Sequence, residues 1–243
     1  EFLKGIGSQY IQFIPIIERK AIEPTDSGIE LVSPSLNYNA QVTEWSVSPS
    51  SYGRFLCDIF DKWVCHDVGH TFVQIFDVTL ANWLGKNPGL CAFSRTCGRA
   101  AVLEYNGDLY SCDHYVYAEN RLGNIMESPL RELMDSSRQF AFGQDKRDTL
   151  PSYCLDCRYL SACHGGCPKH RFNLTPQKNE PGLNYLCPAF KLFFKHVEPY
   201  MDFMAKEFQL NRPPANVMNW AQKRFNKQPS KRIVRGKPLG KKA

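Results

Sequence analysis

The segment Cys154-Leu-Asp-Cys-Arg-Tyr-Leu-Ser-Ala-Cys-His-Gly-Gly-Cys167 places four cysteines in a C-x2-C-x5-C-x3-C pattern. Three more cysteines precede this segment, at Cys91, Cys97 and Cys112, and one follows it, at Cys187. Eight of the ten cysteines in the chain therefore form one spaced array. Eight thiolates are the number that two four-iron clusters need when each cluster takes four cysteine ligands. The array therefore predicts a two-cluster iron–sulfur module.

Disulfides and zinc are the alternative uses of these cysteines. A disulfide framework is typical of small secreted domains, whereas this chain has 243 residues, 43% of them hydrophobic, and we expect no signal peptide at its start. Zinc ribbons also contain C-x2-C pairs, but usually two of them on separate hairpins. Here Cys163 and Cys167 follow Cys157 at short and uneven intervals, which favours iron–sulfur clusters over zinc.

Charge is distributed unevenly along the chain. The net charge is +6, yet residues 211–243 hold ten Lys and Arg and no Asp or Glu, which leaves −4 for the rest. We expect residues 210–243 to be a disordered, solvated basic tail. No nucleic-acid recognition motif accompanies the tail, so a nucleic-acid partner is not expected. No apolar run reaches the roughly 20 residues that span a bilayer, so we expect a soluble, cytoplasmic protein without a membrane partner.

The first part of the chain follows an α/β order. Residues 10–17 form a nearly continuous apolar run, as expected for a buried parallel strand, and residues 18–44 read as a polar connection. A second strand is predicted at residues 71–76 and a short helix at residues 78–84. Strands that alternate with helices in this way are typical of parallel sheets.

Helix and turn signals complete the pattern. A helix is predicted from Ser48-Pro49, with serine as the N-cap and proline at the first helical position; its two cysteines, Cys57 and Cys65, lie outside the array and are expected to be packing residues. The dipeptide Asn106-Gly107 predicts a β-hairpin. A short helix is expected after Ser128-Pro129, and residues 188–209 have the apolar spacing of a long amphipathic helix.

The cysteine array resembles the SPASM domain of radical S-adenosylmethionine enzymes. The resemblance rests on the C-x9-G-x4-C string from Cys97 to Cys112, the 154–167 segment and the final Cys187, in that order. The sequences around the cysteines, at residues 109–115, 121–125 and 163–167, are similar to those of the anaerobic sulfatase-maturating enzymes. The resemblance covers nearly everything from residue 9 to about residue 205.

The resemblance implies an α/β fold with three parts. Residues 1–85 would be the C-terminal end of a partial (β/α)6 radical S-adenosylmethionine barrel, residues 86–209 a cysteine-rich SPASM domain with hairpin and helices, and residues 210–243 the basic tail. The C-x3-C-x2-C loop that binds S-adenosylmethionine and a third [4Fe-4S] cluster in this family is absent from the sequence. We therefore expect the chain to be the C-terminal part of a longer enzyme, and to be inactive alone.

The family pattern also implies a division of the ligands between two auxiliary [4Fe-4S] clusters. The ligands implied for the first cluster are Cys91, Cys97, Cys112 and Cys167. The ligands implied for the second cluster are Cys154, Cys157, Cys163 and Cys187. Asp113 matches the proposed catalytic base of the family, and Ile17 ends the strand that contacts the adenosyl group of the cofactor. His114 and His164 are alternative acids or hydrogen-bond donors beside the cysteines.

By resemblance, the parent enzyme would oxidise a Cys or Ser side chain of an unfolded sulfatase polypeptide to Cα-formylglycine. The auxiliary clusters would serve electron transfer and substrate binding, and an external electron donor or acceptor such as ferredoxin or flavodoxin would be a partner. Three alternatives remain open: another SPASM peptide-modifying enzyme, a ferredoxin-like electron-transfer module and a zinc-stabilised interaction module. The apolar run at residues 10–17 argues against a free-standing ferredoxin, which has no use for it.

Overall fold

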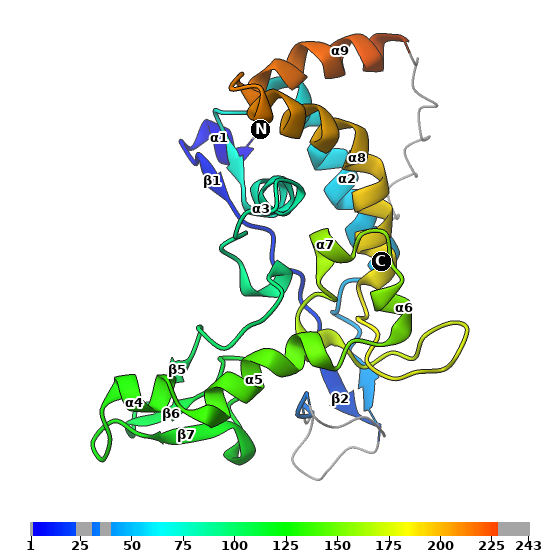
Figure 1. The fold of residues 1–243 in the computed structure, drawn as a ribbon. Coiled ribbons are helices and arrows are strands. Elements are labelled where there is room, and N and C mark those ends of the chain that lie inside the picture. The colour runs from blue at the N-terminus through cyan, green and yellow to red at the C-terminus, as the bar shows by residue number, and fades with distance from the viewer. Residues whose placement is uncertain (1, 23–30, 35–39, 228–243) are drawn as a thin grey trace, which may run out of the picture.

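The computed structural model describes residues 2–22, 31–34 and 40–227. The elements before residue 86 are, in chain order, α1 (Phe2–Gly5), β1 (Tyr10–Ile11), β2 (Arg19–Ala21), β3 (Ala40–Val42), α2 (Pro49–His66), β4 (Phe72–Val73) and α3 (Gln74–Trp83). The elements after residue 86 are η1 (Cys91–Phe93), β5 (Val102–Leu103), β6 (Asp108–Tyr110), η2 (Ala118–Asn120), β7 (Arg121–Asn124), α4 (Leu130–Met134), α5 (Ser137–Asp148), α6 (Ser152–Leu155), α7 (Leu160–Cys163), η3 (Pro168–His170), α8 (Cys187–Gln209), η4 (Pro214–Asn216) and α9 (Val217–Lys227). Helices α2, α3, α8 and α9 gather at one end, and α4, α5 and strands β5–β7 lie at the other (Figure 1).

Strands β1 and β4 form a parallel pair, with helix α2 in the connection between them. The predicted α/β order is therefore confirmed, but both strands are much shorter than predicted. Beyond Ile11 the chain continues without a ladder, held by single contacts such as the bond that the Tyr52 hydroxyl donates to the carbonyl of Phe13 at 3.2 Å. After Val73 the buried residues of α3 recur at helical spacing, so the helix begins at Gln74 rather than at residue 78.

The predicted polar connection at residues 18–44 contains two strands. β2 and β3 pair antiparallel, with Arg19 opposite Val42 and Ala21 opposite Ala40. The sequence pattern indicates only a polar connection in this stretch and does not predict the strand pair. Their sequence has no alternation of apolar and polar side chains long enough to reveal strands of three residues each.

Helix α2 begins as its sequence predicts. The Ser48 hydroxyl accepts a hydrogen bond from the backbone N–H of Ser51 at 3.3 Å, and Pro49 occupies the first helical position. Cys57 and Cys65 are 8% and 7% exposed within the core, which agrees with their predicted role as packing residues.

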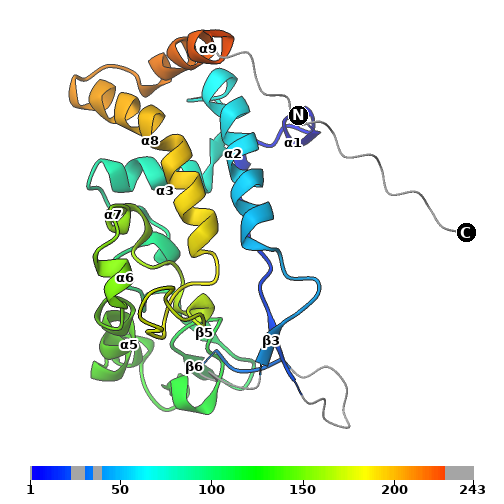
Figure 2. The ribbon, with the colours of Figure 1, turned by 90° about the vertical axis from the view of Figure 1, so that its right-hand side faces the viewer.

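The core lies between α2 and α8, which run side by side (Figure 2). Phe60 of α2 and Phe193 of α8 are both fully buried, and their ring centroids lie 6.2 Å apart with the edge of one ring toward the face of the other. Phe76 of α3 packs on both rings, at 5.1 Å from Phe60 and 5.7 Å from Phe193. One hydrophobic cluster therefore joins residues on both sides of the predicted domain boundary near residue 86.

The predicted hairpin forms at Asn106-Gly107, between β5 and β6, and β7 completes a three-stranded antiparallel sheet. Gly107 has a φ of 88°, a conformation that L side chains rarely adopt. An added Cβ there would also meet the Asn124 side chain at 2.8 Å. The short helix expected after Ser128-Pro129 is α4, and the long amphipathic helix expected at residues 188–209 is α8.

The prediction of a disordered tail from residue 210 is wrong for its first part. Residues 217–227 form α9, and Val217 and Ala221 are fully buried against the core. Trp220 stacks on Phe203 of α8 with ring centroids 5.2 Å apart. The basic residues of α9 concealed its apolar face, since burial of a few well-spaced side chains is enough to dock a helix. The rest of the predicted tail, residues 228–243, lies outside the described residues. Among the described residues, no helix is long and apolar enough to cross a membrane.

Replacement of Phe193 by Ala should lower the free energy of unfolding by about 3–5 kcal/mol, because the change leaves a cavity among rings that cannot all move to fill it. Phe208, on the same helix, is 49% exposed, and Phe208→Ala is the matched control with an expected effect of about 0.5 kcal/mol or less. Urea unfolding of both variants measures the difference. Equal losses in the two variants would show that the α2–α8 contact is not the centre of the core.

Candidate metal centres

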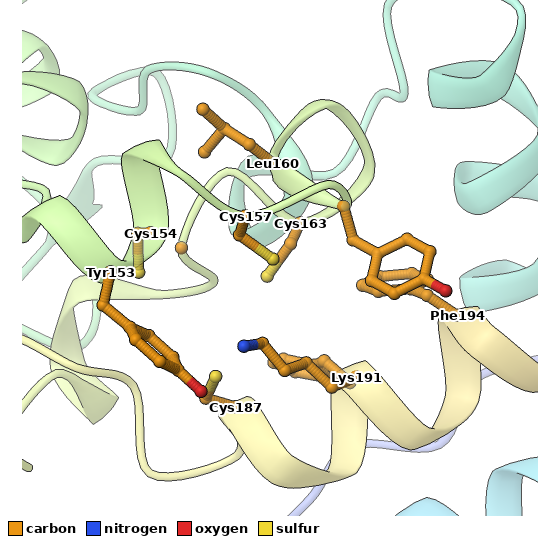
Figure 3. Close-up of a pocket in the computed structure, with 11 residues that line it drawn as sticks. Tyr153, Cys154, Cys157, Leu160, Cys163, Cys187, Lys191 and Phe194 are labelled. Atoms are coloured by element: carbon orange, nitrogen blue, oxygen red, sulfur yellow. The ribbon is translucent and has the colours of Figure 1, made fainter. Parts of the chain in front are cut away.

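Four of the predicted ligands line one pocket. The sulfur atoms of Cys154, Cys157, Cys163 and Cys187 point toward one another across it (Figure 3). They come from α6, the loop after it, the end of α7 and the first residue of α8. The structure thus brings together the four cysteines that the family resemblance implies for the second cluster.

The walls of this pocket are mostly apolar. They include Tyr159, Leu160, Phe190 and Phe194, and among the described residues no carboxylate lines the pocket. Lys191 contributes an ammonium group to the lining, 3.9 Å from the centroid of the Tyr153 ring. An all-sulfur donor set with an apolar surround is the environment in which iron–sulfur clusters are held, so these residues fit such a group.

The thiols of this set raise one another's pKa values. Burial raises the pKa of Cys163 to about 12, and the charges of Cys187, Cys154 and Cys157 contribute in the same direction. Burial likewise raises the pKa of Cys187 to about 11, and the charges of Cys154 and Cys157 add to the effect. Four thiolates in one pocket are therefore unfavourable without a positive charge between them, which a bound metal centre supplies.

The other four predicted ligands are also grouped. Burial raises the pKa of Cys167 to about 11, and the charges of Cys91 and Cys97 act in the same direction. Burial raises the pKa of Cys112 to about 12, with further contributions from Asp113 and from the charge of Cys167. Cys167 does not line the pocket that holds Cys163, and its sulfur lies 3.8 Å from Nδ1 of His114, two residues after Cys112, so Cys167 lies with the first set.

A buried glutamine joins the two loops of this first set. Gln139 of α5 is 2% exposed, and its amide donates to the carbonyl of Gly98 at 2.6 Å and to that of Ser111 at 3.1 Å. Gly98 follows Cys97, and Ser111 precedes Cys112. The amide therefore fixes the distance between these two cysteines, a function that the sequence pattern gave no means to predict.

The chain turns sharply between Cys163 and Cys167. His164, Gly165 and Gly166 have φ values of 46°, 73° and 65°, three consecutive residues in the left-handed region. Their conformation explains how Cys163 can line the pocket of the second set while Cys167 faces the first. Asn184, 2% exposed, supports the turn by donating to the carbonyls of Gly165 and Cys167 at 3.2 and 3.1 Å.

Asp113 lies at the exposed edge of the first set. Its side chain is 67% exposed, and its Oδ1 accepts a hydrogen bond from the Cys112 thiol at 3.1 Å. His114 Nδ1 lies 3.7 Å from the same oxygen and 3.8 Å from the Cys167 sulfur. Ligand atoms of Cys112, Asp113 and His114 all lie within 4.8 Å of one another. This arrangement joins an accessible carboxylate directly to one predicted cluster ligand, Cys112, and places His114 between that carboxylate and a second, Cys167.

The other site predictions fall on buried or backbone positions. Ile17 is 2% exposed within the core, so its side chain packs rather than facing an open site. Its neighbour Glu18 accepts a 2.6 Å bond from Lys169, which lies two residues after Cys167, so the segment of Ile17 adjoins the cysteine site. His164 adopts the left-handed conformation at the end of α7, and burial lowers the pKa of its imidazole.

Comparison with known proteins identifies relatives that match most of the chain. Residues 91–158 match the SPASM family, described as an iron–sulfur cluster-binding domain. A serine-type anaerobic sulfatase-maturating enzyme of Bacteroides thetaiotaomicron is 51% identical over 217 residues, which are 89% of this chain and 52% of that protein. A cysteine-type enzyme of Clostridium novyi is 28% identical over 210 residues, 85% of this chain and 50% of that protein.

A solved structure agrees with these sequence matches. The structure titled "Native anSMEcpe with bound AdoMet and Cp18Cys peptide" superposes with a TM-score of 0.66 at 26% identity, covering 85% of this chain and 53% of that one. The match confirms the predicted fold class, an α/β protein of the radical S-adenosylmethionine type with a SPASM domain. The chain spans about half the length of the relatives that it matches. By these matches, it belongs to the family of anaerobic sulfatase-maturating enzymes.

Proposed function

We propose that the protein takes part in the oxidation of a sulfatase Ser or Cys to Cα-formylglycine, and that the residues described here bind two auxiliary [4Fe-4S] clusters of that enzyme. The observation that supports this most strongly is the grouping of the array: four sulfurs line one pocket, and the charges of four others influence one another around Cys167. The family to which the chain belongs provides the reaction class.

The proposed ligands follow the two groups. The first cluster would be held by Cys91, Cys97, Cys112 and Cys167. The second would be held by Cys154, Cys157, Cys163 and Cys187. Bound there, the clusters would supply one-electron acceptors close to the substrate. S-adenosylmethionine and a third cluster would belong to the complete enzyme, with residues near Ile17 on the cofactor side.

Asp113 is the proposed base. Conversion of a serine CH2–OH or cysteine CH2–SH to an aldehyde begins with loss of hydrogen from Cβ and of a proton from the oxygen or sulfur. An unperturbed cysteine thiol has a pKa near 8.5, and a serine hydroxyl is far less acidic, so the proton needs a positioned acceptor. The Asp113 carboxylate is exposed enough to meet a substrate, and its contacts with Cys112 and His114 fix its position.

The substrate and partners are proposed on the same basis. The higher identity to a serine-type relative, 51% against 28% for the cysteine-type enzyme of Clostridium novyi, favours serine as the oxidised residue. An unfolded sulfatase polypeptide would be the macromolecular substrate. Ferredoxin or flavodoxin would exchange electrons with the clusters, and the protein would act in the cytoplasm. We also propose that residue 86 separates barrel elements from the SPASM domain in this enzyme.

Replacement of Cys154 by Ala should remove one cluster and preserve the other. After anaerobic reconstitution, the native protein should hold close to eight irons and eight sulfides, and the variant about half of each, because each cluster needs its own four thiolates. Iron and sulfide analysis measures the outcome. Cys57→Ala, which changes a buried cysteine outside the array, is the control and should retain both clusters. Loss of both clusters, or of neither, in Cys154→Ala would contradict the proposed division of ligands.

Replacement of Asp113 by Asn should lower formylglycine formation by about 10²- to 10⁴-fold in the complete enzyme, the usual contribution of a general base. S-adenosylmethionine cleavage should continue. Asn keeps the shape of the side chain, and the proton acceptor is needed only for the step that deprotonates the substrate peptide. Mass spectrometry of a serine-containing sulfatase peptide and chromatography of the cleavage product measure the two rates.

Asp145→Asn, at an exposed position of α5, is the matched control and should leave both rates unchanged. If cleavage and formylglycine formation fall together in Asp113→Asn, the residue has a binding or folding role instead. If neither rate falls, His114 becomes the candidate base.

A further inference from the structure

Two buried cations lie among the cysteines. Lys146 of α5 is 1% exposed, and Arg171, just after η3, is mostly buried. In the part of the chain that the structure describes, neither side chain has a carboxylate within 4.0 Å. A buried cation without an anion is unfavourable, because burial removes its hydration and no negative charge nearby compensates for the loss.

Both cations donate to backbone carbonyls. The Lys146 ammonium donates to the carbonyls of Cys91 at 2.5 Å and Ala92 at 2.9 Å, and also to that of Ser94. These three carbonyls belong to the loop that carries the first ligand of the first set. Lys146 therefore holds that loop and places its charge beside the backbone of Cys91, a predicted ligand of the first set.

Arg171 is the link between the two sets. Its Nη2 donates to the carbonyl of His164 at 2.9 Å and its Nε to that of Gly165 at 3.1 Å, which are the turn residues between Cys163 and Cys167. Its Nη1 donates to the Lys146 carbonyl at 2.6 Å. An added Cβ at Gly165 would lie 2.6 Å from the guanidinium, so the turn and the cation are in close contact.

The thiolates near each cation differ. Burial lowers the pKa of Arg171, while the charges of Cys154 and Cys163 in the second set and of Cys167 in the first set oppose that change. The pKa of Lys146 is lowered to about 8, mainly by burial and next by the charge of Arg171, while the charges of Cys97, Cys167 and Cys91, all in the first set, oppose the change. Arg171 thus faces both sets, whereas Lys146 faces one.

We propose that Arg171 is a positioning residue shared by the two clusters: it holds the turn that separates Cys163 from Cys167, and its guanidinium provides the missing counter-charge for both clusters. Lys146 provides counter-charge for the first cluster alone. One electron taken up from a reductant adds one negative charge to a cluster, and a nearby fixed cation favours that reduced state. This inference rests on the proposed cluster binding.

The test is a redox titration of the reconstituted protein with dithionite, followed by electron paramagnetic resonance. Arg171→Met should shift both cluster midpoints to more negative potentials, and Lys146→Met should shift that of the first cluster more than that of the second. The first cluster is assigned by repeating the titration in the Cys154→Ala background. Arg138→Met removes an exposed cation from the same helix as Lys146 and should leave both potentials unchanged.

Unchanged potentials in Arg171→Met, or a shift of only one cluster, would overturn the proposal. If Arg171→Met fails to retain clusters, Arg171→Lys decides. Two clusters with nearly native potentials in that variant support a counter-charge, whereas loss of both clusters would show that the guanidinium has only a structural function. A native protein that holds fewer than two clusters would instead contradict the proposed function, which is a separate outcome of the same measurement.

Discussion

The aromatic contact between α2 and α8 fixes the position of the cysteine site, because α8 begins with Cys187. Phe60 and Phe193 lie in the same packed cluster as Phe190 and Phe194, and the last two also form the wall of the pocket. A shift of α8 along α2 would therefore move one ligand and two wall residues of the second set together. Close packing resists such a shift, since it would open gaps that cost free energy.

The sequence was informative where a local signal has one physical cause. The Asn106-Gly107 turn requires positive φ, which Gly107 provides, and Ser48-Pro49 satisfies the free backbone groups at a helix start. In both cases the residue type itself carries the geometric requirement. The four cysteines that the family resemblance implies for the second cluster line one pocket, although their spacing alone would not separate them from Cys167.

The rest could not be predicted because it depends on distant contacts. Whether residues 10–17 extend as a strand depends on what pairs beside them, and only Tyr10 and Ile11 find a described partner. Lys146 lies on a polar helix, and nothing in the sequence of that helix distinguishes a buried lysine from an exposed one. Its burial depends on the carbonyls of Cys91 and Ala92, which lie far earlier in the chain. Trp220 of α9 is identified as a packing residue only by its contact with Phe203.

The order of the proposed ligands along the chain interleaves the two sets. Cys167 of the first set lies between Cys163 and Cys187 of the second, so the chain segments that close the two sites overlap. Ligation of the first set would join the loop at Cys91 to the turn after Cys163, and ligation of the second would join that turn to α8. Each closure restricts the chain segment that the other must order, so the entropy lost in forming one site reduces the loss in forming the other. The left-handed turn at His164–Gly166 is the point where both closures meet, which is why a single guanidinium there can contact the backbone of one site and lie close to the thiols of both.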